Sequence, residues 1–229
     1  AQKSKTEKKN YVETYVIHCA TKEIMKQKGF EFKYDFSSTS EKEKYQEEYD
    51  KMYAECKRTL YSAGYHIYTS IDPDVQKQLQ SSVDNALSGY TEKDKNGIYK
   101  TQASGTCIDN DTGKVVAIVG GREQKNIGYT LNRAFQSPRQ PGSAIKPLLV
   151  YAPALEHGWS AGSTVNDSPM STKDKNRVRN SHGSYSGQIS LRRAVQKSSN
   201  VATMRIYEQL TPKTCLKYLE EMNFKYLTD

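Results

Sequence analysis

The sequence has 229 residues and a formal net charge of +8 at pH 7, with 35% hydrophobic residues. This length allows one large domain or two small ones with a real core. No apolar run approaches the roughly 20 residues that a membrane-spanning helix needs, and the basic, polar stretch at residues 1–10 does not resemble a signal peptide. We therefore expect either a cytosolic protein or one whose membrane anchor lies outside this sequence.

The positive charge comes from dispersed lysines rather than from one block. No arginine-aromatic platform or zinc-finger spacing accompanies it, so we predict no nucleic-acid binding, whereas an anionic cell envelope would suit this charge. The cysteines form no C-x-x-C pair and the histidines are scattered, so we predict no metal site and no cofactor. Two disulfides stay possible among the four cysteines, which are Cys19, Cys56, Cys107 and Cys215.

Periodicity in the first hundred residues predicts mainly helices. Apolar residues at helical spacing indicate helices over 11–28 and 40–60, the second capped by Ser40. Alternation over 65–70 predicts a strand. Asp72 followed by Pro73 is a good helix start for a helix over 75–87, and a polar loop over 88–100 suggests a domain boundary near residue 98.

The rest of the chain alternates between short strands, loops and helices. Residues 102–109 and 114–119 predict a β-hairpin around residues 110–113. A helix is expected over 143–156, where Pro147 is tolerated near the first turn and Pro153 should bend the helix. Residues 163–190 are expected to form a loop, followed by a helix from Ser190, an apolar pattern over 201–210 and a last helix from Pro212.

Two short motifs suggest catalysis but have simpler interpretations. Asp111-Thr112-Gly113 matches an aspartic-protease loop, yet that chemistry needs two carboxylates, so we interpret the triplet as the hairpin turn. Residues 183–187 resemble a nucleophile elbow, but Tyr185 stands where the serine belongs. We interpret this segment as a loop.

Ser143 and Lys146 are the strongest candidates for catalysis. Residues three apart lie one turn apart on the same face of a helix. A lysine amine there can take the proton from a serine hydroxyl, and burial beside apolar neighbours would lower the pKa of the amine. Pro141 and Gly142 precede the serine and place it at the helix N-terminus, where backbone donors favour a developing anion.

A second motif strengthens this pair. Ser198 and Asn200 supply a hydroxyl and an amide in the order Ser-x-Asn. Ser-x-x-Lys and Ser-x-Asn are two of the three signatures of acyl-enzyme chemistry of the penicillin-binding type.

The surrounding sequence resembles the class A, bifunctional penicillin-binding proteins. The form Arg-Gln-Pro-Gly-Ser and the Lys-Pro ending are similar to class A rather than to the monofunctional class B. The resemblance covers roughly residues 60–212 and rests on residues 61–73 with Gln76, 111–117, Gly120-Gly121, 132–134, 139–147, 150–156, Asn180, Gly187 and Leu191-Arg192.

This resemblance implies an α+β fold of the penicillin-binding and serine β-lactamase type, an antiparallel sheet with helices. Residues 1–98 would be a mostly helical linker, and residues 99–229 the N-terminal part of the D,D-transpeptidase domain. Ser143 would attack the bond between two D-alanines of a peptidoglycan stem peptide, with Lys146 as its base. Ser198 would relay a proton to the leaving amine, and Asn200 would hold the substrate amide and the lysine.

The third family signature, Lys-Thr-Gly or Lys-Ser-Gly, is absent. Lys100-Thr101-Gln102 and Lys213-Thr214-Cys215 fail at the third residue. We therefore expect an internal fragment of an enzyme that is anchored at the extracytoplasmic face of the bacterial membrane. Its expected partners are peptidoglycan stem peptides, β-lactam antibiotics and a glycosyltransferase domain of the full-length chain.

Two other functions stay open at this point. A β-lactamase or a β-lactam sensor would use the same two motifs, although the long linker-like N-terminal part argues against both. A non-catalytic cell-wall-binding module could also have kept the motifs.

Overall fold

A computed structural model describes residues 10–34, 36–123, 131–171 and 177–224. The chain divides into two compact units between Pro138 and Arg139, with residues 33–35 grouped with the second unit. Residues 124–130, within the polar segment before Asn132, and residues 172–176 lie outside the described residues.

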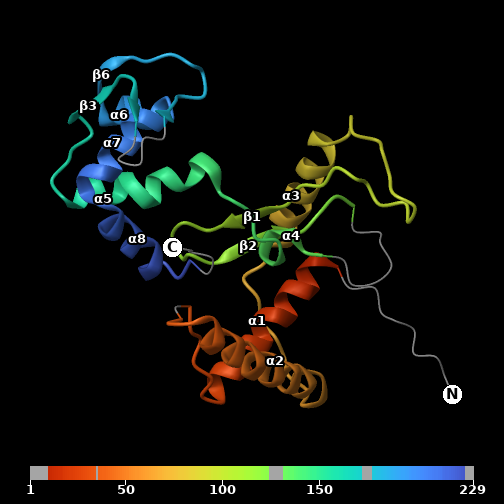
Figure 1. The fold of residues 1–229 in the computed structure, drawn as a ribbon. Helices are drawn as coiled ribbons and strands as arrows, with labels where there is room; N and C mark the ends of the chain where they lie inside the picture. The colour runs from red at the N-terminus through yellow and green to blue at the C-terminus, as the bar shows by residue number, and fades with distance from the viewer. Residues whose placement is uncertain (1–9, 35, 124–130, 172–176, 225–229) are drawn as a thin grey trace. The chain divides into compact units, whose positions relative to one another are not determined.

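The first unit begins with two packed helices (Figure 1), α1 (Tyr11–Gln27) and α2 (Thr39–Ser62). Asn10 and Glu13 form a reciprocal capping box that fixes the start of α1. The cap of α2 is Ser38 and not Ser40, because Ser38 has the extended backbone of a cap and its hydroxyl accepts the Glu41 amide. A small core joins both helices and contains Ile24, Met25, Cys56 and Leu60.

A hairpin follows α3 (Pro73–Ala86) and packs against it. Its strands, β1 (Gly105–Ile108) and β2 (Val115–Val119), pair antiparallel with Thr106 opposite Ile118. The Gln76 side chain on α3 accepts from the Ile118 amide at 2.8 Å and donates to the Ile118 carbonyl at 3.0 Å. The hairpin thus shares a compact unit with the preceding helices, while the domain division at residue 98 stays a prediction.

The two simpler motif interpretations agree with the structure. Residues 110–112 form the hairpin turn, where the Asp109 carboxylate accepts from the Asp111 amide and the Thr112 hydroxyl. Residues 183–186 form a loop, and Gly187 already begins the next strand.

The predicted strand over residues 65–70 is wrong. Residues 65–72 are irregular and belong to no β-ladder within the described part of the chain. Two hydrogen bonds join this segment to the first residues of β2: the Ser70 hydroxyl donates to the Val115 carbonyl and the Asp72 amide to the Val116 carbonyl. Alternation shows which side chains share a face, but a strand also needs a partner along its length.

Residues 143–156 are helical, as predicted, but the type of helix changes along the segment. A 3₁₀ turn, η1 (Gly142–Ile145), leads into a π turn, η2 (Pro147–Tyr151), and then into α5 (Ala152–Glu156). Proline lacks the amide that the α-helical ladder needs, and prolines begin or closely follow the π turn. The later helices are α6 (Leu191–Gln196), capped by Ser190, α7 (Asn200–Leu210) and α8 (Pro212–Glu221).

The predicted loop over 163–190 is also wrong, because it contains four short strands. β3 (Thr164–Asp167) pairs antiparallel with β6 (Gly187–Ser190), and β4 (Met170–Ser171) pairs with β5 (Arg177–Val178). Because these segments are polar, their sequence did not indicate that they would pair as strands in the folded chain. β3 and β6 contribute to the core of the second unit, which contains Val150, Tyr151, Ala154, Val165, Ile189, Leu191, Ala194, Ala202 and Ile206.

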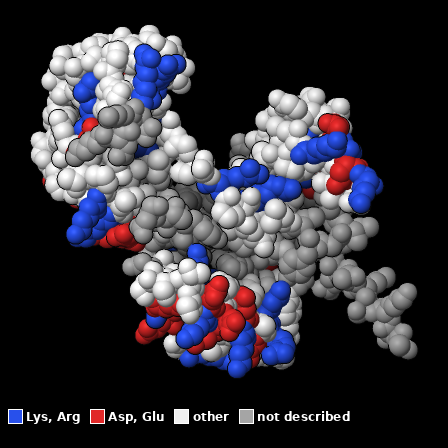
Figure 2. Space-filling model, in the orientation of Figure 1, with Lys and Arg blue, Asp and Glu red and all other residues white. Residues whose placement is uncertain are grey.

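The fold class is α+β with small antiparallel sheets, as predicted. Acidic and basic side chains are intermixed over α2 on the face that Figure 2 shows, which agrees with dispersed charge. All four cysteines are free thiols. Within the described residues, no helix is both long and apolar enough to cross a bilayer.

Candidate active site

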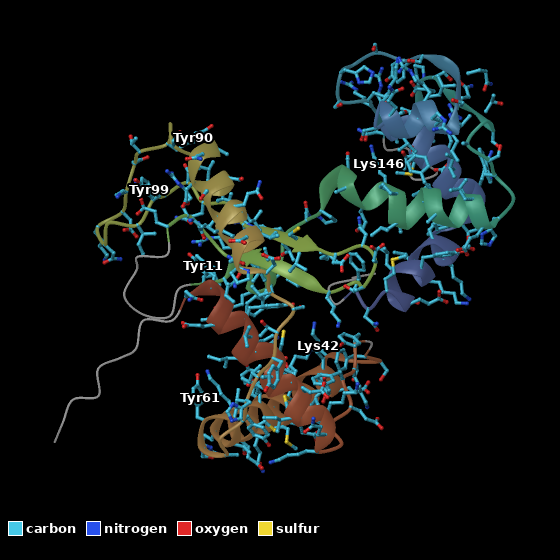
Figure 3. The ribbon with its side chains drawn as sticks, turned by 180° about the vertical axis from the view of Figure 1, so that it is seen from behind. Tyr11, Lys42, Tyr61, Tyr90, Tyr99 and Lys146 are labelled. Atoms are coloured by element: carbon cyan, nitrogen blue, oxygen red, sulfur yellow. The ribbon has the colours of Figure 1, made fainter. Side chains whose placement is uncertain are left out.

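The amine of Lys146 meets the start of α7. Lys146 Nζ lies 2.7 Å from the carbonyl oxygen of Ser198, 3.1 Å from Ser198 Oγ and 2.6 Å from Asn200 Oδ1. The half-buried lysine follows η1, and Figure 3 labels it near the start of this helical segment. The structure therefore joins the two sequence motifs across a separation of 52 residues.

Ser143 lies one 3₁₀ turn before Lys146, and the Lys146 amide donates to the Ser143 carbonyl. Side chains three residues apart are eclipsed in a 3₁₀ turn, which brings both onto one side of the segment. Ser143 is exposed, and its hydroxyl forms no hydrogen bond with any described residue. Gly142 reaches this turn with φ +56°, a left-handed conformation that suits glycine.

Ser198 has an unusual backbone conformation for a residue other than glycine, with φ +50°. This left-handed geometry lies between α6 and α7, and the Ser198 carbonyl and hydroxyl both approach Lys146 Nζ. The side chain of Asn200 is oriented by its amide nitrogen, because Nδ2 donates to the Arg179 carbonyl at 2.8 Å. Its Oδ1 is thereby left to accept from the lysine.

Asp167, Asn180 and Ser199 form a buried polar cluster next to these residues. Each of the three is at most 4% exposed. Asp167 Oδ1 accepts from Ser199 Oγ and Asn180 Nδ2, both at 2.8 Å, and its Oδ2 accepts from the Ser186 amide at 3.0 Å. Asn180 Oδ1 accepts from the Asn200 amide at 2.9 Å. The cluster connects the end of β3 to the start of α7.

Burial shifts the pKa values at the site. It lowers the pKa of Lys146 below the ordinary value of lysine, because desolvation disfavours the charged amine. This is the direction that the sequence predicts from burial beside apolar neighbours; of these neighbours, Leu148 is itself exposed, whereas Ile145 and Leu149 are half-buried. Burial also raises the pKa of Asp167, but hydrogen bonds from Asn180, Ser199 and the Ser186 amide outweigh it, and the pKa stays below the usual range.

Sequence reasoning missed Asp167 and Ser199 and noted Asn180 only as a family match. Ser199 carried a detectable signal, because a serine before an apolar helical pattern is a typical N-cap, and its hydroxyl does accept the Ala202 amide. Asp167 carried none, since an isolated aspartate in a polar stretch is common. No group of three or more His, Cys, Asp or Glu within the described residues is arranged to hold a metal ion.

Comparison with known families shows the family of this chain. Residues 103–229, more than half of the chain, match the penicillin-binding protein transpeptidase domain. The chain belongs to this family. The candidate motifs Ser143-x-x-Lys146 and Ser198-x-Asn200 both lie inside the matched range.

Curated relatives support the class A assignment. The chain is 38% identical over 195 residues to penicillin-binding protein 1A of Clostridium perfringens, which covers 79% of this chain and 27% of that protein. It is 30% identical over 217 residues to penicillin-binding protein 4 of Bacillus subtilis, covering 94% and 32%. The chain thus spans about a quarter to a third of these relatives.

Solved structures show the same fold. The penicillin-binding protein PonA1 of Mycobacterium tuberculosis superposes with a TM-score of 0.63 at 22% identity, over 90% of this chain and 44% of PonA1. A complex of PonA1 with penicillin V gives a TM-score of 0.62 at 21% identity, over 93% of this chain and 46% of PonA1.

Proposed function

We propose that this chain carries the nucleophile of a peptidoglycan D,D-transpeptidase, a serine acyltransferase that cross-links stem peptides ending in D-Ala-D-Ala. The observation that carries the proposal is the contact of Lys146 Nζ with Ser198 and Asn200. This contact unites the two signatures of acyl-enzyme chemistry around one amine of lowered pKa.

Acylation would begin with Lys146 as a neutral amine. The two N–H groups of that amine can donate to the Ser198 carbonyl and to Asn200 Oδ1, at 2.7 and 2.6 Å. Its lone pair can then take the Ser143 proton as Ser143 Oγ attacks the carbonyl carbon between the D-alanines. The Ser143 amide would be one donor to the resulting oxyanion.

Collapse of the tetrahedral intermediate would break the peptide C–N bond and leave an ester on Ser143. The departing D-alanine amine needs a proton, which the Lys146 ammonium can pass through Ser198 Oγ, 3.1 Å away. The amine of a neighbouring stem peptide would then attack the ester, forming the cross-link and releasing Ser143. A β-lactam would acylate the same serine with no departing amine and persist there.

We place this activity on the extracytoplasmic face of the bacterial membrane, in a longer protein with its own anchor and a glycosyltransferase domain. The length of the curated relatives supports this view, because this chain matches 27% of penicillin-binding protein 1A of Clostridium perfringens.

The test is covalent labelling of the full-length protein with a fluorescent penicillin. We expect one label per protein on Ser143 and complete loss of labelling in Ser143→Ala. A matched control is Ser160→Ala, an exposed serine of the same unit, which should label normally. Rapid turnover of the β-lactam instead of a stable adduct would indicate a β-lactamase. Normal cell-wall function of Ser143→Ala would indicate a binding module.

A further inference from the structure

We infer that Asp167 is a positioning residue for the Lys146 site. Its buried carboxylate holds the start of α7, so that Ser198 and Asn200 stay within reach of the lysine amine. The kinetic consequence of this inference rests on the proposed function, whereas its structural consequence does not.

One oxygen of the carboxylate is occupied by contacts that lead to α7. Asp167 is 0% exposed, and Ser199 and Asn180 both donate to its Oδ1 at 2.8 Å. A buried carboxylate is costly unless hydrogen bonds compensate it. Each compensating side chain therefore becomes tied to one fixed point at the end of β3.

Both tied side chains cap the first turn of α7. Ser199 Oγ accepts the Ala202 amide at 3.0 Å, while Asn180 Oδ1 accepts the amides of Asn200 at 2.9 Å and Val201 at 3.2 Å. The first amides of a helix have no partner inside the helix. The cluster thus satisfies three of them with side chains whose orientation Asp167 sets.

This cap also explains how Ser198 keeps its strained conformation. A left-handed backbone at a residue other than glycine is strained, and it persists only where its surroundings enforce it. Ser199 is anchored on the C-terminal side of Ser198, and the Ser198 amide donates to the Val195 carbonyl on the N-terminal side. With both ends held, the Ser198 carbonyl and hydroxyl point at Lys146 Nζ.

The experiment compares Asp167→Ala and Asp167→Asn in the full-length protein. The acylation rate constant and the non-covalent dissociation constant for a fluorescent penicillin are measured separately. We expect Asp167→Ala to lower the rate constant about 10- to 100-fold, because small displacements of catalytic groups cost this much, and to change the dissociation constant little. Asp167→Asn should recover part of the rate, since its amide oxygen can still accept from Ser199 and Asn180 but its amide nitrogen cannot accept from the Ser186 amide.

Tyr151→Phe is the matched control. It removes another buried hydrogen bond to α7, the 2.7 Å contact between the Tyr151 hydroxyl and Thr203 Oγ1, and leaves the hydrogen bonds between the Asp167, Asn180 and Ser199 side chains in place. Its acylation rate should stay within about twofold of wild type. An equal loss of rate in Tyr151→Phe and Asp167→Ala would reduce Asp167 to a stabilising role and overturn the inference.

Hydrogen exchange over residues 198–203 gives a readout independent of activity. Asp167→Ala should lose protection in these amides, whereas Tyr151→Phe should not. If wild-type protein is never labelled, the proposed function fails and exchange alone decides the role of Asp167. Wild-type exchange in Asp167→Ala, or wild-type acylation, would refute the inference.

Discussion

Lys146 is surrounded by three oxygens, from the Ser198 carbonyl, the Ser198 hydroxyl and the Asn200 amide. An ammonium has three donors and fits all of them as acceptors. A neutral amine has two donors, which fit the Ser198 carbonyl and Asn200 Oδ1, and a lone pair that stays available for a proton. The site therefore accommodates both protonation states that an acid-base catalyst must alternate between.

The pH dependence of acylation follows from this residue. Desolvation lowers the pKa of Lys146, so raising the pH converts ammonium to the reactive amine before ordinary lysines lose their protons. We expect the acylation rate of the full-length protein to rise with pH to a plateau, with a midpoint below the ordinary pKa of lysine. Rapid-quench labelling across a pH series measures it.

Lys146→Arg provides the control, because a guanidinium keeps its proton at every accessible pH. This variant should not label at any pH. A flat pH profile for the wild type, or normal labelling of Lys146→Arg, would exclude the lysine as the base.

At the scale of elements, the hairpin is held by very close contacts. A Cβ added to Gly120 would lie 2.5 Å from Asn132 Oδ1 and 2.6 Å from the ring of Tyr11. The side-chain Nδ2 of Asn132 also donates to the Tyr11 carbonyl at 3.1 Å, at the start of α1 (Figure 3). Glycine is therefore required at position 120 for the end of β2 to approach α1.

Gly120→Ala should destabilise the protein by about 1–3 kcal/mol, the usual cost of overpacking a filled core. Urea unfolding followed by circular dichroism measures the free energy of unfolding. Gly89→Ala is the matched control, because an added Cβ meets nothing within 4 Å there, and its effect should stay within about 0.5 kcal/mol. Equal stability of the two variants would show that the backbone moves to accept the methyl group.

At the scale of the whole molecule, we expect the proposed reaction to need more than the two motifs on this chain. The third signature, Lys-Thr-Gly or Lys-Ser-Gly, does not occur in these 229 residues. In the family that the sequence resembles, a later strand carries it together with the second oxyanion donor. The complete domain should therefore be far more reactive than this chain in isolation.

We accordingly expect this chain in isolation to be acylated at least about 100-fold more slowly than the full-length protein, the cost of one lost oxyanion donor. Time courses with a fluorescent penicillin, with Ser143→Ala as background, measure both rates. Rapid, stoichiometric labelling of Ser143 on the isolated chain would contradict this expectation.

The sequence by itself determined the three long helices of the first unit, the hairpin and the four candidate residues of the site. These features depend on local signals: helical periodicity, turn residues and serines at fixed distances from a lysine or an asparagine. The helical segment that carries Ser143 and Lys146 needs no distant partner to bring the two residues within one turn of each other.

Only the tertiary structure decided which distant segments pair. Residues 65–70 alternate like a strand but join no β-ladder in the described part of the chain, whereas the polar stretch 163–190 contains strands because β3 and β6 pair. The tertiary structure also brings Lys146 to Ser198 and joins Asp167 to Ser199 at the start of α7. The physical reason is the same in each case. Hydrogen bonds between segments far apart in the chain leave no periodic signal in the sequence. The burial of a single carboxylate leaves none either.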